Sequence, residues 1–154
     1  MSTSILEPSA VEFDLSLDTL VEQVMSQRIV ECSGDTPLHV AAHRMQEERV
    51  SCILVVDEHR VRGIWTEHDI LELDLMQENV LDRPIEDFMS TPVKSIRRDA
   101  PLSNAALRMR AENIRHFLVV DDEGQRLGLL TQTDVILNQG VEFYLHLREV
   151  GSVM

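Results

Sequence analysis

The chain has 154 residues, 44% apolar and 27% charged, which is the composition of an ordinary globular protein of one domain or two small ones. Its formal net charge of −13 argues against a general affinity for nucleic acid or anionic membranes, because the far field repels phosphate groups. The sequence has no apolar run long enough to cross a membrane and no signal-peptide pattern, so we expect a cytoplasmic protein.

The first half of the chain predicts a flexible lead-in followed by one set of short elements. Residues 1–16 are polar and without a sustained period, which predicts the lead-in. A short helix is expected at 17–25 and a short strand at 29–32. Asp35-Thr36-Pro37 is typical of a helix start, since proline in the first turn loses no hydrogen bond. The residues that then recur at helical spacing, and predict a face buried in a core, are Leu38, Ala41, Ala42 and Met45.

A hairpin and a final helix complete this set. Residues 52–56 form a continuous apolar run, which predicts a strand buried on both faces. Residues 57–60 are expected to turn, residues 61–65 to return as the second arm, and a helix to start at Thr66. Cys32 and Cys52 lie in apolar runs without CxxC spacing, so we expect both to be reduced, structural thiols.

The same set of elements recurs in the second half, because the sequence repeats itself. A shift of 64 places aligns residues 35–38 with 99–102, and residues 54–57 with 118–121. After one inserted residue, Gly63-Ile-Trp-Thr66-Glu-His-Asp69 aligns with Gly128-Leu-Leu-Thr131-Gln-Thr-Asp134. Two copies are too few for a solenoid and predict two units packed together. The second copy predicts elements at 85–89, 93–96, from 102, at 117–120, at 126–130 and from Thr131.

The repeat defines the expected domains and fold class. We expect a lead-in at 1–16, a first repeat at 17–80, a second repeat at 81–139, and a C-terminal helix or connector at 140–154. The element order predicts an α/β (α+β) fold in which two tandem β-α-β-β-α units pack pseudo-symmetrically.

Gly-x-x-Thr-x-x-Asp, at the end of the last strand of each copy, is the sharpest local motif. Glycine permits close approach of a ligand, and a threonine hydroxyl with free N–H groups at a helix start suits a phosphate. The aspartate one turn later can accept both hydroxyls of a ribose. The pairs Thr66/Asp69 and Thr131/Asp134 also fit a helix cap, which needs no ligand. The motif alone leaves both interpretations open, with capping favoured.

Positive charge is concentrated in the second copy. Residues 94–126 hold 7 of the 14 basic residues and carry a net charge of +2, whereas the remainder of the chain carries −15. A small phosphorylated ligand could find local positive charge there. Arginines that merely decorate helix surfaces are an equal alternative.

The repeat order, the Met-Ser-Thr-Pro-Val93 segment, the apolar Val-Val-Asp strand and the doubled Gly-x-x-Thr-x-x-Asp motif resemble paired cystathionine-β-synthase (CBS) domains, also called a Bateman module. The resemblance covers about residues 20–140. It implies binding of an adenosine-containing ligand, such as AMP, ADP, ATP or S-adenosylmethionine, in clefts between the repeats. No further cofactor is implied.

The resemblance also implies roles for particular residues. Asp69 and Asp134 would bind the ribose hydroxyls, and Thr66 and Thr131 would lie near the phosphate. Residues at the first strand and at the entry to the buried strand of each copy would enclose the base: Ile29, Val93, Cys52, Ile53, His116 and Phe117.

The two copies differ at this proposed site. The second copy has Arg115-His116 where the first has Ser51-Cys52, and Leu54 and Leu118 replace a proline that is frequent in the family. We therefore expect unequal clefts, with the second, including Arg115, better suited to a phosphate.

The expected function is that of a regulatory module and not of an enzyme, since no P-loop, nucleophile elbow or paired catalytic carboxylate motif is present. An enzyme that uses His68 or His116 as its catalytic base is disfavoured, because the sequence shows no nucleophile or set of metal ligands to accompany either histidine. His39 and His43 are better explained by a solvated helix face than by a zinc site. We expect ligand binding to shift the population of conformations. The alternative is a ligand-free dimerisation scaffold.

The partners are expected to be a second copy of the chain and an output domain. The run 139–149 is similar to connectors that follow CBS pairs in bacterial signalling proteins with diguanylate cyclase or phosphodiesterase output domains. A homodimer through the helices is expected, and binding to nucleic acid or membranes is not.

Overall fold

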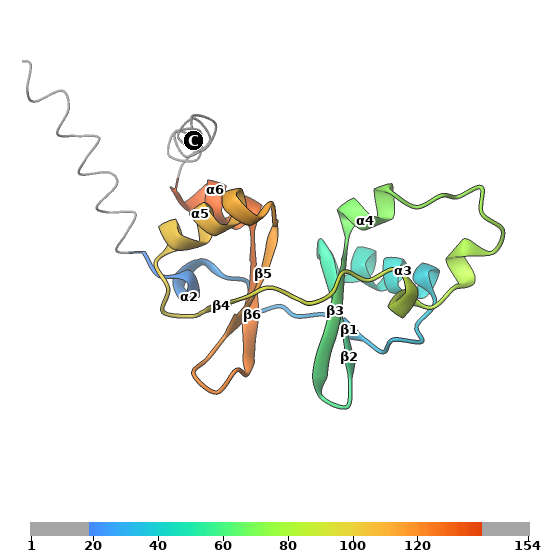
Figure 1. Ribbon diagram of the computed structural model, residues 1–154, viewed down its shortest axis with the longest axis horizontal. Coiled ribbons are helices and arrows are strands. Elements are labelled where there is room, and N and C mark those ends of the chain that lie inside the picture. The colour runs from blue at the N-terminus through green and yellow to red at the C-terminus, as the bar shows by residue number, and fades with distance from the viewer. Residues whose placement is uncertain (1–18, 140–154) are drawn as a thin grey trace, which may run out of the picture. The chain divides into compact units, whose positions relative to one another are not determined.

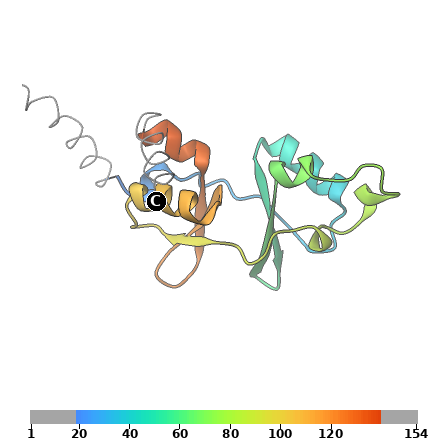
Figure 2. The same ribbon diagram turned by 45° about the horizontal axis from the view of Figure 1, so that its top comes forward.

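The computed structural model describes residues 19–139, which form two compact units (Figures 1 and 2). Unit 1 comprises residues 19–27 and 94–139, and unit 2 comprises Arg28–Val93. Each unit contains a three-stranded sheet with helices, which confirms the predicted α/β (α+β) fold in two copies. The predicted lead-in at 1–16 and the connector at 140–154 lie outside the described residues.

Unit 2 contains a mixed sheet in the order β1-β2-β3. β1 runs parallel to β2, and helix α3 forms the crossover between them, whereas β2 and β3 form an antiparallel hairpin. One core lies between the sheet and the helices, and it includes Leu38, Ile53 and Trp65. The bounds are β1 Glu31–Cys32, α3 Leu38–Glu48, β2 Cys52–Asp57, β3 Arg60–Thr66, α4 Glu67–Leu71, η2 Val80–Asp82 and η3 Ile85–Asp87.

Unit 1 repeats this architecture with a sheet in the order β4-β5-β6. β4 is parallel to β5, and β5 and β6 form the hairpin. Its core includes Leu102, Phe117, Leu130 and Val135, so the sheet and both long helices contribute to it. The bounds are α2 Val21–Val24, β4 Ser95–Arg97, α5 Leu102–Glu112, β5 His116–Val120, β6 Arg126–Thr131 and α6 Gln132–Gln139.

The two crossover helices begin and end in the same way, as the repeat predicts. Pro37 and Pro101 are the N-caps of α3 and α5, with φ of −62° and −61°. Arg49 and Asn113 end the helices in the left-handed region, with φ of 56° and 54°. Asparagine tolerates this conformation better than arginine does. The helix end is therefore a property of the repeated fold and not of one particular residue type.

The segment at the start of each sequence repeat forms backbone hydrogen bonds with residues of the other repeat. In unit 1, the N–H of Val21 donates to the carbonyl of Ala100 (2.9 Å), and the N–H of Leu102 donates to that of Thr19 (2.7 Å). Ser26 and Leu129 exchange two backbone hydrogen bonds of 2.9 and 2.8 Å. Residues 19–27, assigned by sequence to the first repeat, thus complete the unit built from the second.

Residues 84–90 do the same for unit 2. The N–H of Ile85 donates to the carbonyl of Thr36 (2.8 Å), and Ser90 and Ile64 exchange bonds of 2.8 and 3.0 Å. Ile85 is fully buried in the core of unit 2. The compact units and the sequence repeats are therefore two different divisions of the chain.

Residues 19–27 and 84–90 form less helix than the sequence suggests. Within the described residues, which begin at 19, the helix expected at 17–25 covers Val21–Val24, and that expected at 85–89 is the 3-10 helix Ile85–Asp87. Met25 already has an extended backbone, with ψ of 154°, and leads into the Ser26–Leu129 pairing. Pairing with a sheet thus prevails over local helix preference, which is weak in so short a segment.

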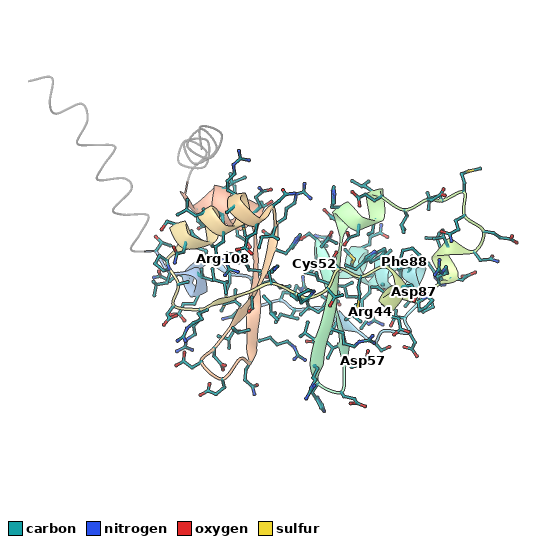
Figure 3. All side chains as sticks on the ribbon, in the orientation of Figure 1. Arg44, Cys52, Asp57, Asp87, Phe88 and Arg108 are labelled. Carbon is teal, nitrogen blue, oxygen red and sulfur yellow. The ribbon has the colours of Figure 1, made fainter. Side chains whose placement is uncertain are left out.

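The thiols are buried, as predicted for structural cysteines. Cys32 and Cys52 are both free, and Figure 3 labels Cys52 at the start of β2. Burial, and to a smaller degree the negative charge of Glu67, raises the pKa of Cys52 to about 12. Burial also raises the pKa of Cys32. Both groups are therefore protonated and unreactive at neutral pH.

Replacing Gly128 by alanine is expected to destabilise the protein by about 1–3 kcal/mol, the usual cost of forcing atoms into a packed site. A Cβ at Gly128 would lie 2.5 Å from the backbone oxygen of Ser26, so the backbone of residues 19–27 would have to shift near Ser26. At Gly63, the equivalent position, a Cβ would meet the Met89 side chain, which can adjust. Urea unfolding of both alanine variants measures the difference. Equal stability of Gly128→Ala and wild type would contradict this pairing.

Candidate functional site

Four predicted site residues of the second copy lie together at one end of the β5–β6 hairpin in unit 1. His116 is paired with Thr131 across the two strands. The N–H of Gln132 donates to the carbonyl of Arg115 (2.9 Å), which holds the start of α6 against the entry of β5. Asp134 follows in the first turn of α6. The fold therefore brings Arg115, His116, Thr131 and Asp134 to the same edge.

Thr131 and Asp134 are joined by reciprocal hydrogen bonds. The N–H of Thr131 donates to Oδ2 of Asp134 (2.9 Å), and the N–H of Asp134 donates to Oγ1 of Thr131 (3.1 Å). Both residues are half-buried. The aspartate is thereby fixed in position at the start of the helix.

Unit 2 has the same arrangement at its own hairpin. Thr66 is paired with Cys52, and the N–H of Glu67 donates to the carbonyl of Ser51 (3.0 Å). The N–H of Thr66 donates to Oδ2 of Asp69 (2.9 Å), and the N–H of Asp69 donates to Oγ1 of Thr66 (3.3 Å). The sequence repeat has thus produced two structurally equivalent sites.

The capping interpretation of the motif is confirmed, because these bonds form a capping box. Capping occupies only Oδ2 of each aspartate. Among the described residues, Oδ1 of Asp69 and of Asp134 accepts no hydrogen bond. A carboxylate fixed by one oxygen and open at the other can still accept a ribose hydroxyl, so capping and ligand binding are compatible.

The helix starts are less suited to a phosphate than the sequence suggested. The N–H groups of Thr131, Gln132 and Asp134 are each already donated within unit 1. The expectation of several free backbone donors is therefore wrong, because the cap and the strand entry use them. An anionic group at this edge would therefore depend more on side chains such as that of Arg115 than on backbone donors.

The positive charge of the second copy is partly neutralised. At least three of its seven basic residues form ion pairs with described residues: Arg97 with Asp99 and Asp122, Arg98 with Glu22, and Arg108 with Glu112. Arg115 is exposed and has no ion pair among residues 19–139. The first copy has Ser51 at this position, so the charge difference predicted between the copies is present at the two edges.

The remaining predicted site residues lie elsewhere. Ile53 and Phe117 are fully buried in the cores of units 2 and 1, and the Arg108 guanidinium lies 4.6 Å from the centroid of the Phe117 ring; Figure 3 labels Arg108. Ile29 and Val93 are half-buried in unit 2. Contact of these four residues with a ligand stays a prediction, and the complete burial of the Ile53 and Phe117 side chains disfavours it for those two.

The two histidines of helix α3, His39 and His43, each lie beside a different carboxylate. Nε2 of His43 lies 3.0 Å from Oε1 of Glu47, and Nε2 of His39 lies 3.5 Å from Oδ1 of Asp82. All four side chains are more than half exposed. No group of three or more potential metal ligands occurs in the described part of the chain. Likewise, no helix within residues 19–139 is long and apolar enough to span a membrane.

A groove of about 510 Å³ in unit 2 adjoins the edge that holds Thr66 and Asp69, because Ser51 and Glu67 of that edge are among its lining residues. It lies between α3 and α4, and none of the predicted site residues lines it. Its lining residues are Ala42, Met45, Gln46, Arg49, Val50, Ser51, Glu67 and Ile70. Trp65 is buried in the core of unit 2.

The chain belongs to the CBS domain family. The family model for the CBS domain matches it twice, at residues 21–76 and 85–139, which confirms the resemblance deduced from the repeat. CBS domain pairs of known structure share the fold of this chain.

Relatives and solved structures show the same pair. An uncharacterised 17.7 kDa protein of Acidianus ambivalens is 26% identical over 118 residues, which are 76% of this chain and 71% of the relative. The CBS pair of protein MJ0100, solved with 5′-methylthioadenosine and S-adenosyl-L-methionine, is 27% identical with a TM-score of 0.69, over 80% of this chain and 98% of that one. CBSX2, solved with AMP, is 22% identical with a TM-score of 0.63, over 77% of this chain and 94% of that one, which shows the common fold.

The chain spans only part of many curated relatives. It covers 50% of the length of one and between 22% and 32% of five others. In those proteins the matched region therefore accompanies other segments.

Proposed function

We propose that this chain is a non-catalytic regulatory module that binds an adenosine-containing ligand. The observation that carries the proposal is the pair of equivalent, half-buried aspartates, Asp69 and Asp134, each fixed by a threonine and each with one carboxylate oxygen open. A rigidly held carboxylate acceptor suits the two hydroxyls of a ribose. The MJ0100 pair, at 27% identity, holds two adenosine derivatives, which supports this ligand class.

The second edge is proposed to bind more tightly than the first. Arg115 adds an unpaired cation beside Asp134, and it would pair with the phosphate of a nucleotide or the carboxylate of S-adenosylmethionine. Ser51 offers no charge at the equivalent position beside Asp69. Occupancy would then favour one conformation of the module and be passed to a partner, such as a second copy of the chain or a signalling output domain.

The second candidate is a ligand-free dimerisation scaffold. The capping boxes favour it, because Thr66/Asp69 and Thr131/Asp134 already stabilise their helices without a ligand. Such a cap contributes about 1 kcal/mol, which is reason enough to retain the residues.

Thermal melting with AMP, ADP, ATP and S-adenosylmethionine separates the two candidates. A ligand at 100 times its Kd adds about 2.7 kcal/mol of stability. For a chain of this size that raises Tm by about 5–11 °C. We expect such a rise with at least one of the four, whereas unchanged melting with all four at millimolar concentration would favour the scaffold.

A further inference from the structure

The chain that follows helix α4 in unit 2 has no counterpart in the described part of the second copy. α4 ends at Leu71 after five residues, and the chain continues through turns to η2. The equivalent helix α6 continues for eight residues, to Gln139. Figures 1 and 2 both show this light-green stretch running out beyond α4. We call residues 71–82 the acidic segment.

Exposed apolar side chains are concentrated on the acidic segment. Among residues 19–138, seven large apolar side chains are exposed, and four of them lie within these twelve residues. Their exposed fractions are 84% for Leu71, 69% for Leu75, 92% for Met76 and 43% for Leu81. Single exposed apolar residues are common, but a cluster of them marks an interaction surface.

The acidic segment is held against unit 2 in a defined conformation. Leu73 packs against the core, and Val80 is part of it, so the segment is anchored at two points. Backbone hydrogen bonds from Gln77 to Asp74 (3.1 Å) and from Val80 to Gln77 (3.3 Å) close successive turns between these anchors. The exposed side chains are therefore presented on a fixed backbone, which lowers the entropy cost of binding a partner.

The charge of the acidic segment indicates the chemistry of that partner. Residues 71–82 contain Glu72, Asp74, Glu78 and Asp82 and no lysine or arginine, so they carry −4. Such a surface repels nucleic acid and anionic lipid, and it attracts a surface that combines basic with apolar side chains. A basic amphipathic helix has this combination.

We propose that the acidic segment is a docking surface for a protein partner that presents a basic, amphipathic helix. The proposal is independent of ligand binding, because neither Thr66/Asp69 nor Thr131/Asp134 belongs to the segment. Failure of one proposal therefore leaves the other standing.

Selection of a random peptide library on the full chain tests the proposal. We expect enrichment of peptides in which Lys or Arg alternates with Leu, Ile, Phe or Trp at helical spacing. A synthetic peptide of the enriched sequence should bind at least tenfold more weakly to a variant that combines Leu71→Ser, Leu75→Ser and Met76→Ser. It should bind several-fold more weakly to Glu72→Gln/Glu78→Gln, and more weakly at high salt, since exposed charges are screened.

Leu137→Ser is the matched control, because Leu137 is 77% exposed on α6 and far along the sequence from the segment. It should leave peptide affinity unchanged. The proposal would be overturned if the wild-type chain enriched no peptides beyond those that the triple serine variant enriches. It would also be overturned by equal peptide affinity for the wild type and the triple variant, or by enriched peptides that lack basic residues. A further contradicting result would be that the wild-type chain is a dimer, that the triple serine variant is a monomer, and that no selected peptide disrupts the dimer. The occupant of the surface would then be a second copy of the chain.

Discussion

Replacing Asp134 by alanine is expected to weaken binding of the adenosine ligand by at least tenfold, and by more than replacing Asp69. A hydrogen bond to a charged group contributes about 1.5–3 kcal/mol, and each 1.4 kcal/mol is a factor of about ten in affinity. The edge of Asp134 also holds Arg115, whereas that of Asp69 holds Ser51. Titration calorimetry of both variants with the same ligand measures the difference.

Asp69→Ala is also the matched control for this experiment. Each substitution removes an equivalent cap, so the loss of about 1 kcal/mol in helix stability is common to both. Equal losses of affinity would contradict the dominance of the second edge. Unchanged affinity in both variants would contradict the role of these carboxylates at the ribose.

Replacing Phe117 by alanine is expected to lower the free energy of unfolding by about 3–5 kcal/mol, the usual cost of removing a buried aromatic side chain. Phe117 is fully buried in the core of unit 1, and Arg108 lies over its ring at 4.6 Å. Denaturant unfolding measures the loss. Phe117→Leu keeps most of the volume and should cost less than about 1.5 kcal/mol.

Phe117→Leu also tests the predicted contact with the base. Since the side chain lies within the core, we expect this variant to bind the ligand with the affinity of the wild type. A loss of affinity without a comparable loss of stability would instead assign Phe117 to the ligand, as the family resemblance implied.

Much of the fold follows from the sequence, because the repeat and the apolar periodicity agree. The apolar stripe from Leu38 to Met45 predicted α3, and the run at 52–56 predicted β2; both are observed. The turn at 57–60 is observed too, although Glu58 and His59 adopt positive φ values of 51° and 67°. Such features are local, so one stretch of sequence is enough to predict them.

The division into compact units was not predictable in this way. That residues 19–27 complete unit 1 depends on bonds such as that from Val21 to Ala100, between residues far apart in sequence. Their amino-acid types carry no sign of these partners. The shortened helices at Val21–Val24 and Ile85–Asp87 have the same cause.

The sequence predicted the residues of the candidate site, but not which backbone N–H groups would be free to bind a ligand. The repeated Thr and Asp and the Arg115/Ser51 difference come directly from the alignment of the two copies. That the N–H of Gln132 is already donated to the carbonyl of Arg115 depends on the register of β5 with β6. Only the structure shows that the N–H groups of Thr131, Gln132 and Asp134 are already used within unit 1.

Titration calorimetry of the wild-type chain with AMP, ADP, ATP and S-adenosylmethionine tests the central claim most directly. We expect saturable binding of at least one of them, with one dominant site per chain, and loss of that site in Asp134→Ala. The absence of saturable binding for all four at millimolar concentration would contradict the claim.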